Sequence, residues 1–255
     1  MRSIICIAAL AGLGALLAAG DCRAQSWGDL KGQVVWTGGA IPAKENITPN
    51  KDVQHCLSKG PLISDALVID PTSKGVKNVM VWLAPAEAGG KIPIHPSLAA
   101  VPKEKVVIDQ PCCMFTPRIT MMREGQTLEI KNSAPVLHNS KVIGSPTVNG
   151  TFNLSIPANT SIEKHPKAEK KPMLLNCDIH GWMGGRIGVF NHPYFAVTKD
   201  DGTFEIKNAP AGKFKIYLQH EKSGWLHHGG TSAGQEITIK PGSNDLGKFE
   251  MSKAE

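Results

Sequence analysis

A short stretch near the middle of the chain, NCDIHGWM (176–183), places a thiol, an imidazole and a thioether close together. The residues that carry them are Cys177, His180 and Met183. A cysteine thiolate and an imidazole nitrogen bind either zinc or copper, whereas a thioether is a soft ligand that suits copper. The methionine therefore favours copper over the structural zinc site that cysteine and histidine alone would allow.

A further ligand has to come from elsewhere in the chain, because a trigonal copper site uses two histidines, one cysteine and a weak axial methionine. The best candidate is His138 in TLEIKNSAPVLHNSKV (127–142), which follows an expected strand and a proline-containing turn. A β-sandwich can bring the end of that strand against the end of the expected strand MLLNC (173–177).

The elements that must position these residues are expected to be short strands. Glycine and proline are frequent (26 and 18 residues), apolar runs are short, and long helical periodicity is absent, which together predict an all-β fold. Strands are expected at 33–36, 66–70, 78–84, 105–109, 118–121, 127–132, 151–156, 173–177, 186–190, 203–208, 213–220 and 236–240. This length favours two small sandwiches over one large domain.

The middle block of the chain, residues 101–191, holds all the candidate ligands and resembles the cupredoxin, or blue copper, family. The resemblance rests on NSAPVLHN (132–139), CDIHGWM (177–183) and the strand GGRIGVF (184–190). The Cys-x-x-His-x-x-Met spacing is similar to the short ligand loop of amicyanin, whereas plastocyanin and pseudoazurin have a longer gap before the methionine. The binuclear purple-copper relatives need a second cysteine in this loop, which the sequence lacks.

This resemblance implies a Greek-key sandwich with one type 1 copper ion. His138, Cys177 and His180 would be its equatorial ligands and Met183 its axial ligand. Asn139 would support the site, its backbone amide bonding the thiolate and its side chain bracing the ligand loop. The outer edge of the His180 imidazole would lie at an apolar surface and serve as the electron route.

The flanks of the chain, residues 25–100 and 192–255, resemble a different module. The stretch FAVTKDDGTFEIKNAPAGKFKIYLQHE (195–221) is similar to carboxypeptidase regulatory-like, or transthyretin-like, sandwiches. Their opening strand is expected in GQVVWTGGAIPA (32–43), far upstream. We therefore predict that the cupredoxin-like block is inserted into, or docked on, a sandwich built from both flanks; two independent flanking domains are the alternative.

The N-terminal residues 1–24 read as a cleaved secretory signal peptide, because Arg2 precedes a short apolar run and small residues flank the cleavage site. The mature protein is then expected to be periplasmic or secreted, without a membrane span. Such a compartment allows a disulfide. With Cys177 taken by a metal, we expect Cys56 to pair with Cys112 or Cys113, because vicinal cysteines rarely bridge each other.

The function expected from these features is one-electron transfer by an exported blue copper protein, alone or as a module. Copper trafficking or storage is the alternative, and an adhesion or carbohydrate-binding sandwich with a structural metal is a second one. No catalytic residues are assigned and an enzyme is not expected, since multicopper oxidases and nitrite reductases need His-x-His motifs that the sequence lacks.

The charge of the chain favours protein partners. Loss of residues 1–24 lowers the formal net charge from +6 to +5, since Arg2, Arg23 and Asp21 leave. The lysines are scattered and form no arginine-rich or aromatic patch, which argues against nucleic-acid binding. We expect redox partner proteins that are acidic at the docking surface.

Overall fold

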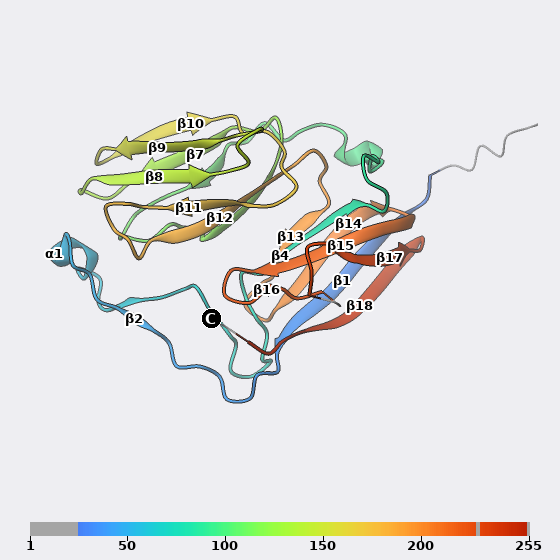
Figure 1. Cartoon of the computed structure of the whole chain (residues 1–255), viewed down its shortest axis with the longest axis horizontal. Helices are drawn as coiled ribbons and strands as arrows, with labels where there is room; N and C mark the ends of the chain where they lie inside the picture. The colour runs from blue at the N-terminus through green and yellow to red at the C-terminus, as the bar shows by residue number, and fades with distance from the viewer. Residues whose placement is uncertain (1–24, 228–229, 254–255) are drawn as a thin grey trace, which may run out of the picture.

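A computed structural model describes residues 25–227 and 230–253 of the chain (Figure 1). The expected signal peptide, residues 1–24, lies outside the described residues. The fold is nearly all β, as predicted, and its strands form two sandwiches that lie side by side. Among the described residues, no helix is both long and apolar enough to cross a membrane.

The first sandwich draws its strands from both flanks of the sequence. β1 (Trp27–Trp36) lies between β14 (Thr203–Pro210), to which it is antiparallel, and β18 (Gly242–Met251), to which it is parallel. The other sheet of this sandwich consists of β4 (Met80–Pro85), β13 (Phe195–Val197), β15 (Gly212–His220), β16 (Gly224–Trp225) and β17 (Gln235–Ile239). Each sheet of the first sandwich therefore contains strands from both flanks. The likeness of the flanks to regulatory-like modules stays a prediction.

Strand β15 shows why these segments pair as they do. Its residues alternate in burial, so that Phe214, Ile216 and Leu218 point into the core while Lys213 points to solvent. This is the period of two that a half-buried strand requires. The expected strand at 66–70, by contrast, forms only an isolated bridge at Ile69.

The second sandwich is built from the middle block. One sheet has the order β6-β12-β11-β8-β9 and the other has the order β10-β7-β5. The strands are β5 (Val106–Ile108), β6 (Ile119–Arg123), β7 (Leu128–Asn132), β8 (His138–Ile143), β9 (Thr151–Ile156), β10 (Thr160–Lys164), β11 (Met173–Asn176) and β12 (Gly184–Phe190). A separate apolar core, which includes Ile108, Leu175 and Ile187, fills the space between the two sheets.

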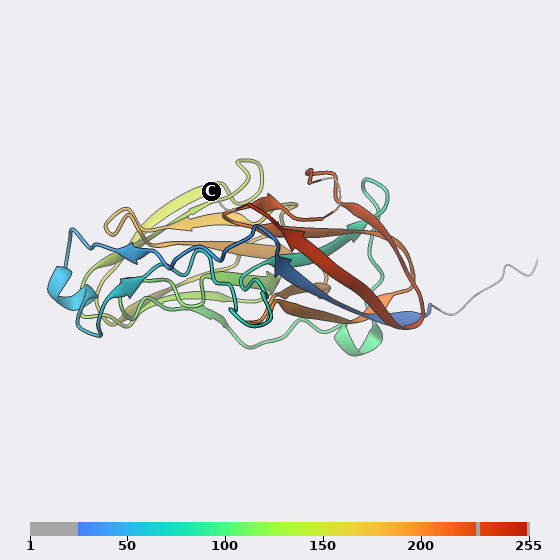
Figure 2. The ribbon, with the colours of Figure 1, turned by 90° about the horizontal axis from the view of Figure 1, so that it is seen from below.

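A segment of the N-terminal flank leaves the first sandwich and reaches the far end of the second. This segment, residues 46–63, is called the strap below; it contains β2 (Asn46–Ile47), α1 (Val53–Cys56) and β3 (Leu62–Ile63). Figure 2 shows α1 at the end of the molecule opposite to β18. The flank 25–100, which also contains the short helix η1 (Pro96–Leu98), thus contributes to both sandwiches.

The two sandwiches meet through a small apolar cluster and a buried ion-pair network. Trp82 of β4 stacks on Tyr217 with ring centroids 5.2 Å apart and packs with Phe190 of the second sandwich. Arg118, just before β6, pairs with Glu221 after β15 and, at 2.7 Å, with Asp65 beyond the strap. The Arg118 and Glu221 side chains are only 9% and 8% exposed, so each depends on its partner.

Candidate metal centre

Three of the four predicted ligands, His138, Cys177 and His180, meet at one end of the second sandwich. His138 is the first residue of β8, and Cys177 follows the last residue of β11, which pairs antiparallel with β8. The ligand atoms of His138, Cys177 and His180 all lie within 4.8 Å of one another, and all three residues are buried. The structure therefore brings together the three residues that the sequence argument from neighbouring strand ends had joined.

Met183 closes the loop that begins at Cys177. Its backbone amide donates to the His180 carbonyl oxygen at 2.9 Å, and its carbonyl oxygen accepts from the Cys177 amide at 3.3 Å. The Met183 side chain is 1% exposed and belongs to the same apolar cluster as Cys177. Gly185, two residues after Met183, lies very close to the residue before β6. A Cβ at this position would lie 2.4 Å from the Arg118 carbonyl oxygen, so glycine is what allows the start of β12 to approach β6.

His138 has the environment of a ligand rather than of a core histidine. Its side chain is fully buried, and neither ring nitrogen has a hydrogen-bond partner among the described residues. Burial, followed by the neighbouring His180 and His55, lowers the pKa of His138 to about 4, so the ring is neutral at physiological pH. Two unsatisfied nitrogens in the interior are costly, and a metal bound by one of them removes part of that cost.

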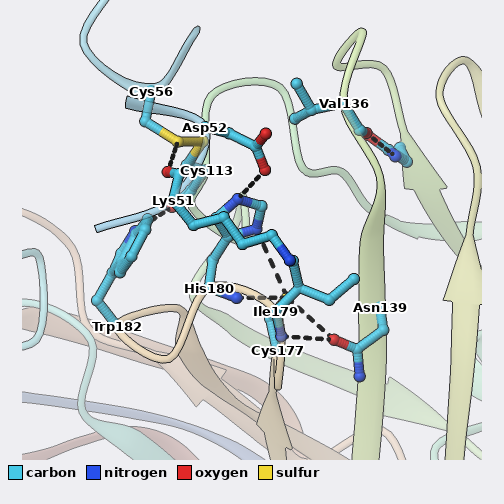
Figure 3. Close-up of polar contacts among 11 residues, drawn as sticks. Lys51, Asp52, Cys56, Cys113, Val136, Asn139, Cys177, Ile179, His180 and Trp182 are labelled. Atoms are coloured by element: carbon cyan, nitrogen blue, oxygen red, sulfur yellow. Dashed lines mark hydrogen bonds and ion pairs between the residues drawn. A yellow bond between two sulfur atoms is a disulfide. The ribbon is translucent and has the colours of Figure 1, made fainter. Parts of the chain in front are cut away.

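Asn139 holds the ligand loop through its side chain. Its Oδ1 accepts hydrogen bonds from Cys177 Sγ at 3.2 Å, from the Asp178 amide at 2.8 Å and from the Ile179 amide at 3.1 Å (Figure 3). The backbone-amide bond to the cysteine sulfur that was expected from Asn139 comes instead, in the described part of the chain, from His180 at 3.4 Å.

The outer edge of His180 differs from the expectation. The side chain is fully buried, and its Nε2 lies 2.9 Å from Asp52 Oδ2 of the strap, whereas its Nδ1 faces Cys177 Sγ at 3.9 Å. The prediction that this edge lies at an open apolar surface is therefore wrong, because the strap covers it. Burial lowers the pKa of His180, and the Asp52 carboxylate opposes that shift.

The strap is fixed to the second sandwich by a disulfide. Of the two pairings that the sequence left open, the structure contains Cys56 with Cys113, whose Cα atoms are 5.5 Å apart, and Cys112 pairs with no other cysteine in the described part of the chain. The carbonyl oxygen of Cys113 accepts from Trp182 Nε1 at 3.0 Å, which links the disulfide to the ligand loop. Both sulfurs also lie within 4.8 Å of a His180 ring nitrogen, but as a disulfide they are not thiolate ligands.

The sequence reasoning missed Asp52. It is 128 residues away from His180, and neither its neighbours nor its spacing mark it as part of a metal centre. The one signal that pointed in its direction was the predicted disulfide of Cys56, since that bond brings the strap to the site.

Comparison with known proteins gives only distant likenesses. No protein-family profile and no curated protein match the chain. A purple cupredoxin from Nitrosopumilus maritimus is 20% identical, with 32% of this chain and 97% of that one covered, at a TM-score of 0.28. An oxidised amicyanin variant is 15% identical, with 33% and 81% covered, at 0.30.

A copper-containing nitrite reductase from Thermus scotoductus SA-01 is 19% identical at a TM-score of 0.31. It covers 42% of this chain, but the chain spans only 25% of the reductase. Likenesses of this strength carry no argument about function, which is therefore inferred from the site itself.

Proposed function

We propose that the chain is a type 1 copper protein that transfers one electron at a time. His138, Cys177 and His180 would be the strong ligands and Met183 the weak axial one. The observation that carries the proposal is the buried group of one thiol and two imidazoles within 4.8 Å, in which neither nitrogen of His138 has a hydrogen-bond partner among the described residues. Copper would supply the one-electron couple, and the chain would exclude water and hold the ligands still.

The choice of copper depends on Met183. Its buried thioether belongs to the same cluster as Cys177, and a closed zinc site would call for a nitrogen, oxygen or thiolate ligand instead. The Cys-x-x-His-x-x-Met order also resembles the ligand loop of amicyanin.

Electron transfer is favoured over copper trafficking or storage because the site is closed. The three strong ligands are at most 2% exposed, and Asn139 holds the ligand loop by three hydrogen bonds. A protein that hands its metal to another has to expose ligands to the acceptor, whereas electron transfer needs only close approach. A rigid site also suits a couple in which little moves when the electron leaves.

We propose that the protein binds redox partners without catalysing a reaction of its own. An exported location, periplasmic or secreted, is supported by the Cys56–Cys113 disulfide, because such bonds persist outside the reducing cytoplasm. The formal net charge, +6 for the full chain and +5 without residues 1–24, would speed encounters with acidic partners more than it would strengthen binding.

The test is the visible spectrum and voltammetry of the copper-loaded full chain. We expect strong thiolate-to-copper absorption in the red part of the spectrum and a reversible one-electron wave. Cys177→Ser should remove the absorption, whereas Cys112→Ser, at a free cysteine outside the site, should keep it. A colourless copper adduct of the unmodified protein, or an irreversible wave, would rule out the electron carrier.

A further inference from the structure

Asp52 lies directly before helix α1, at its N-cap position, but its side chain does not cap the helix. An aspartate at this position normally accepts a hydrogen bond from a backbone amide of the first turn, but the Asp52 side chain makes no such bond. The residue also has a φ of 48°, in the left-handed region that residues with a Cβ seldom adopt. Aspartate adopts this region more readily than most residues, and in this conformation its carboxylate makes no bond to the first turn of the helix and contacts another group.

The carboxylate is directed at the outer nitrogen of His180 instead. Figure 3 shows Asp52 on the side of the His180 ring that faces away from Cys177. A hydrogen bond from Nε2–H to Asp52 Oδ2, at 2.9 Å, leaves Nδ1 as the nitrogen with a free lone pair, and Nδ1 is the one that faces Cys177. This contact selects the tautomer that the proposed copper ligand needs.

We propose that Asp52 is a positioning residue of the copper site, which orients His180 and lowers the reduction potential; the proposal rests on the copper-binding function above. A carboxylate that accepts the second N–H of a ligand histidine makes the histidine a stronger donor, which favours Cu(II) over Cu(I). The negative charge of Asp52 acts in the same direction. Lys51 opposes it, but Lys51 is exposed and its charge is screened by solvent.

The strap is anchored so that this contact persists. The Cys56–Cys113 disulfide fixes the end of α1, four residues after Asp52, and Trp182 of the ligand loop donates to the Cys113 carbonyl oxygen. The disulfide therefore restrains the segment that carries Asp52, and the Trp182 hydrogen bond restrains the loop that carries His180. A redox partner would approach the strap at this point rather than the bare edge of His180, because His180 is fully buried beneath it.

The test compares the reduction potentials of Asp52→Asn and Asp52→Glu with that of the unmodified copper-loaded chain. Asparagine adopts the left-handed conformation readily, so Asp52→Asn removes the charge without disturbing the turn. We expect about a tenfold change in the ratio of Cu(II) to Cu(I) affinity, which equals a rise of about 59 mV for one electron. Asp52→Glu keeps the charge but has a longer side chain and fits the left-handed turn less well, so its potential should lie between that of Asp52→Asn and that of the unmodified chain.

The matched control is Glu45→Gln, because Glu45 is an exposed carboxylate just before the strap. It should leave the potential unchanged. Equal potentials for Asp52→Asn, Glu45→Gln and the unmodified chain would overturn the role of Asp52. Failure of the copper proposal is a separate result, since the unmodified chain would then show no thiolate-to-copper band.

A second readout needs no copper. Imidazole nitrogen NMR of the metal-free chain should find His180 with its proton on Nε2, and Asp52→Ala should give a mixture of the two tautomers. A proton on Nδ1 in the unmodified chain would contradict the assigned role of Asp52.

Discussion

Removal of the Cys56–Cys113 disulfide is expected to destabilise the protein strongly. The bond joins residues separated by 57 positions in the sequence. In the chain-entropy treatment, a closed loop of that length lowers the entropy of the unfolded chain enough to stabilise the folded state by about 4 kcal/mol at 25 °C. Cys56→Ser should lose roughly this amount, which corresponds to a fall in melting temperature of roughly 8–16 °C for a chain of this size.

The assay is urea and thermal unfolding of the metal-free full chain under non-reducing conditions. Cys112→Ser is the matched control, because Cys112 is adjacent in sequence to the bridge but takes no part in it. Its free energy of unfolding should change by about 0.5 kcal/mol or less. If Cys56→Ser and Cys112→Ser lose the same stability, the loop-closure reasoning is refuted.

The same variant separates the disulfide from the metal site. Copper-loaded Cys56→Ser should keep its thiolate-to-copper absorption, because the proposed thiolate belongs to Cys177. Its reduction potential should rise towards that of Asp52→Asn, because release of the strap weakens the contact of Asp52 with His180. Loss of the absorption in Cys56→Ser, with retention in Cys177→Ser, would show that the ligands are wrongly assigned.

Three further changes test other parts of the structure. Asn139→Ala removes the acceptor of three hydrogen bonds in the ligand loop and should weaken copper binding about 10- to 100-fold, measured by competition with a chelator. Burial lowers the pKa of His192 and of His220 to about 4, below the ordinary 6.5. Stability should therefore be full above pH 6.5 and fall as the pH drops towards 4, by roughly 3 kcal/mol per histidine. Replacing both with glutamine should flatten that loss in urea titrations at pH 7 and 4.5. Arg118→Met should cost about 3–5 kcal/mol in the same assay, because it leaves the Glu221 carboxylate buried without its partner.

The proximity of the candidate ligands was predictable because these residues are marked by type and by local spacing. Cys177, His180 and Met183 share one loop, and His138 follows an expected strand, so adjacency of strand ends is enough to bring them together. The strand that carries His138 was nevertheless missed. His138, Asn139 and Ser140 of β8 are all buried although all are polar, because β8 lies between β11 and β9 at the candidate metal centre. Hydrophobic periodicity cannot detect such a strand.

Asp52 was not predictable for a different reason. Its position depends on a left-handed residue, on a four-residue helix and on a disulfide to a distant loop, none of which has a periodic signature. The false strand at 66–70 has the same origin: ALVID has the composition of a strand, but only Ile69 finds a bridge partner. Both errors concern the connection between the two sandwiches, where tertiary contacts determine the local conformation.

That connection also explains why the flanks matter to the metal centre. The strap leaves the first sandwich after β1, covers His180, and returns to Asp65, where Arg118 of the second sandwich binds it together with Glu221 of the first. The strap is therefore held at its tip by the Cys56–Cys113 disulfide and just beyond its C-terminal end by the Arg118 network. Because the carboxylate that contacts His180 is supplied by a segment of the flank, the first sandwich would act as a scaffold for the proposed copper site rather than as an independent neighbour. Changes that loosen the Arg118 network should for this reason alter the reduction potential as well as the stability of the fold.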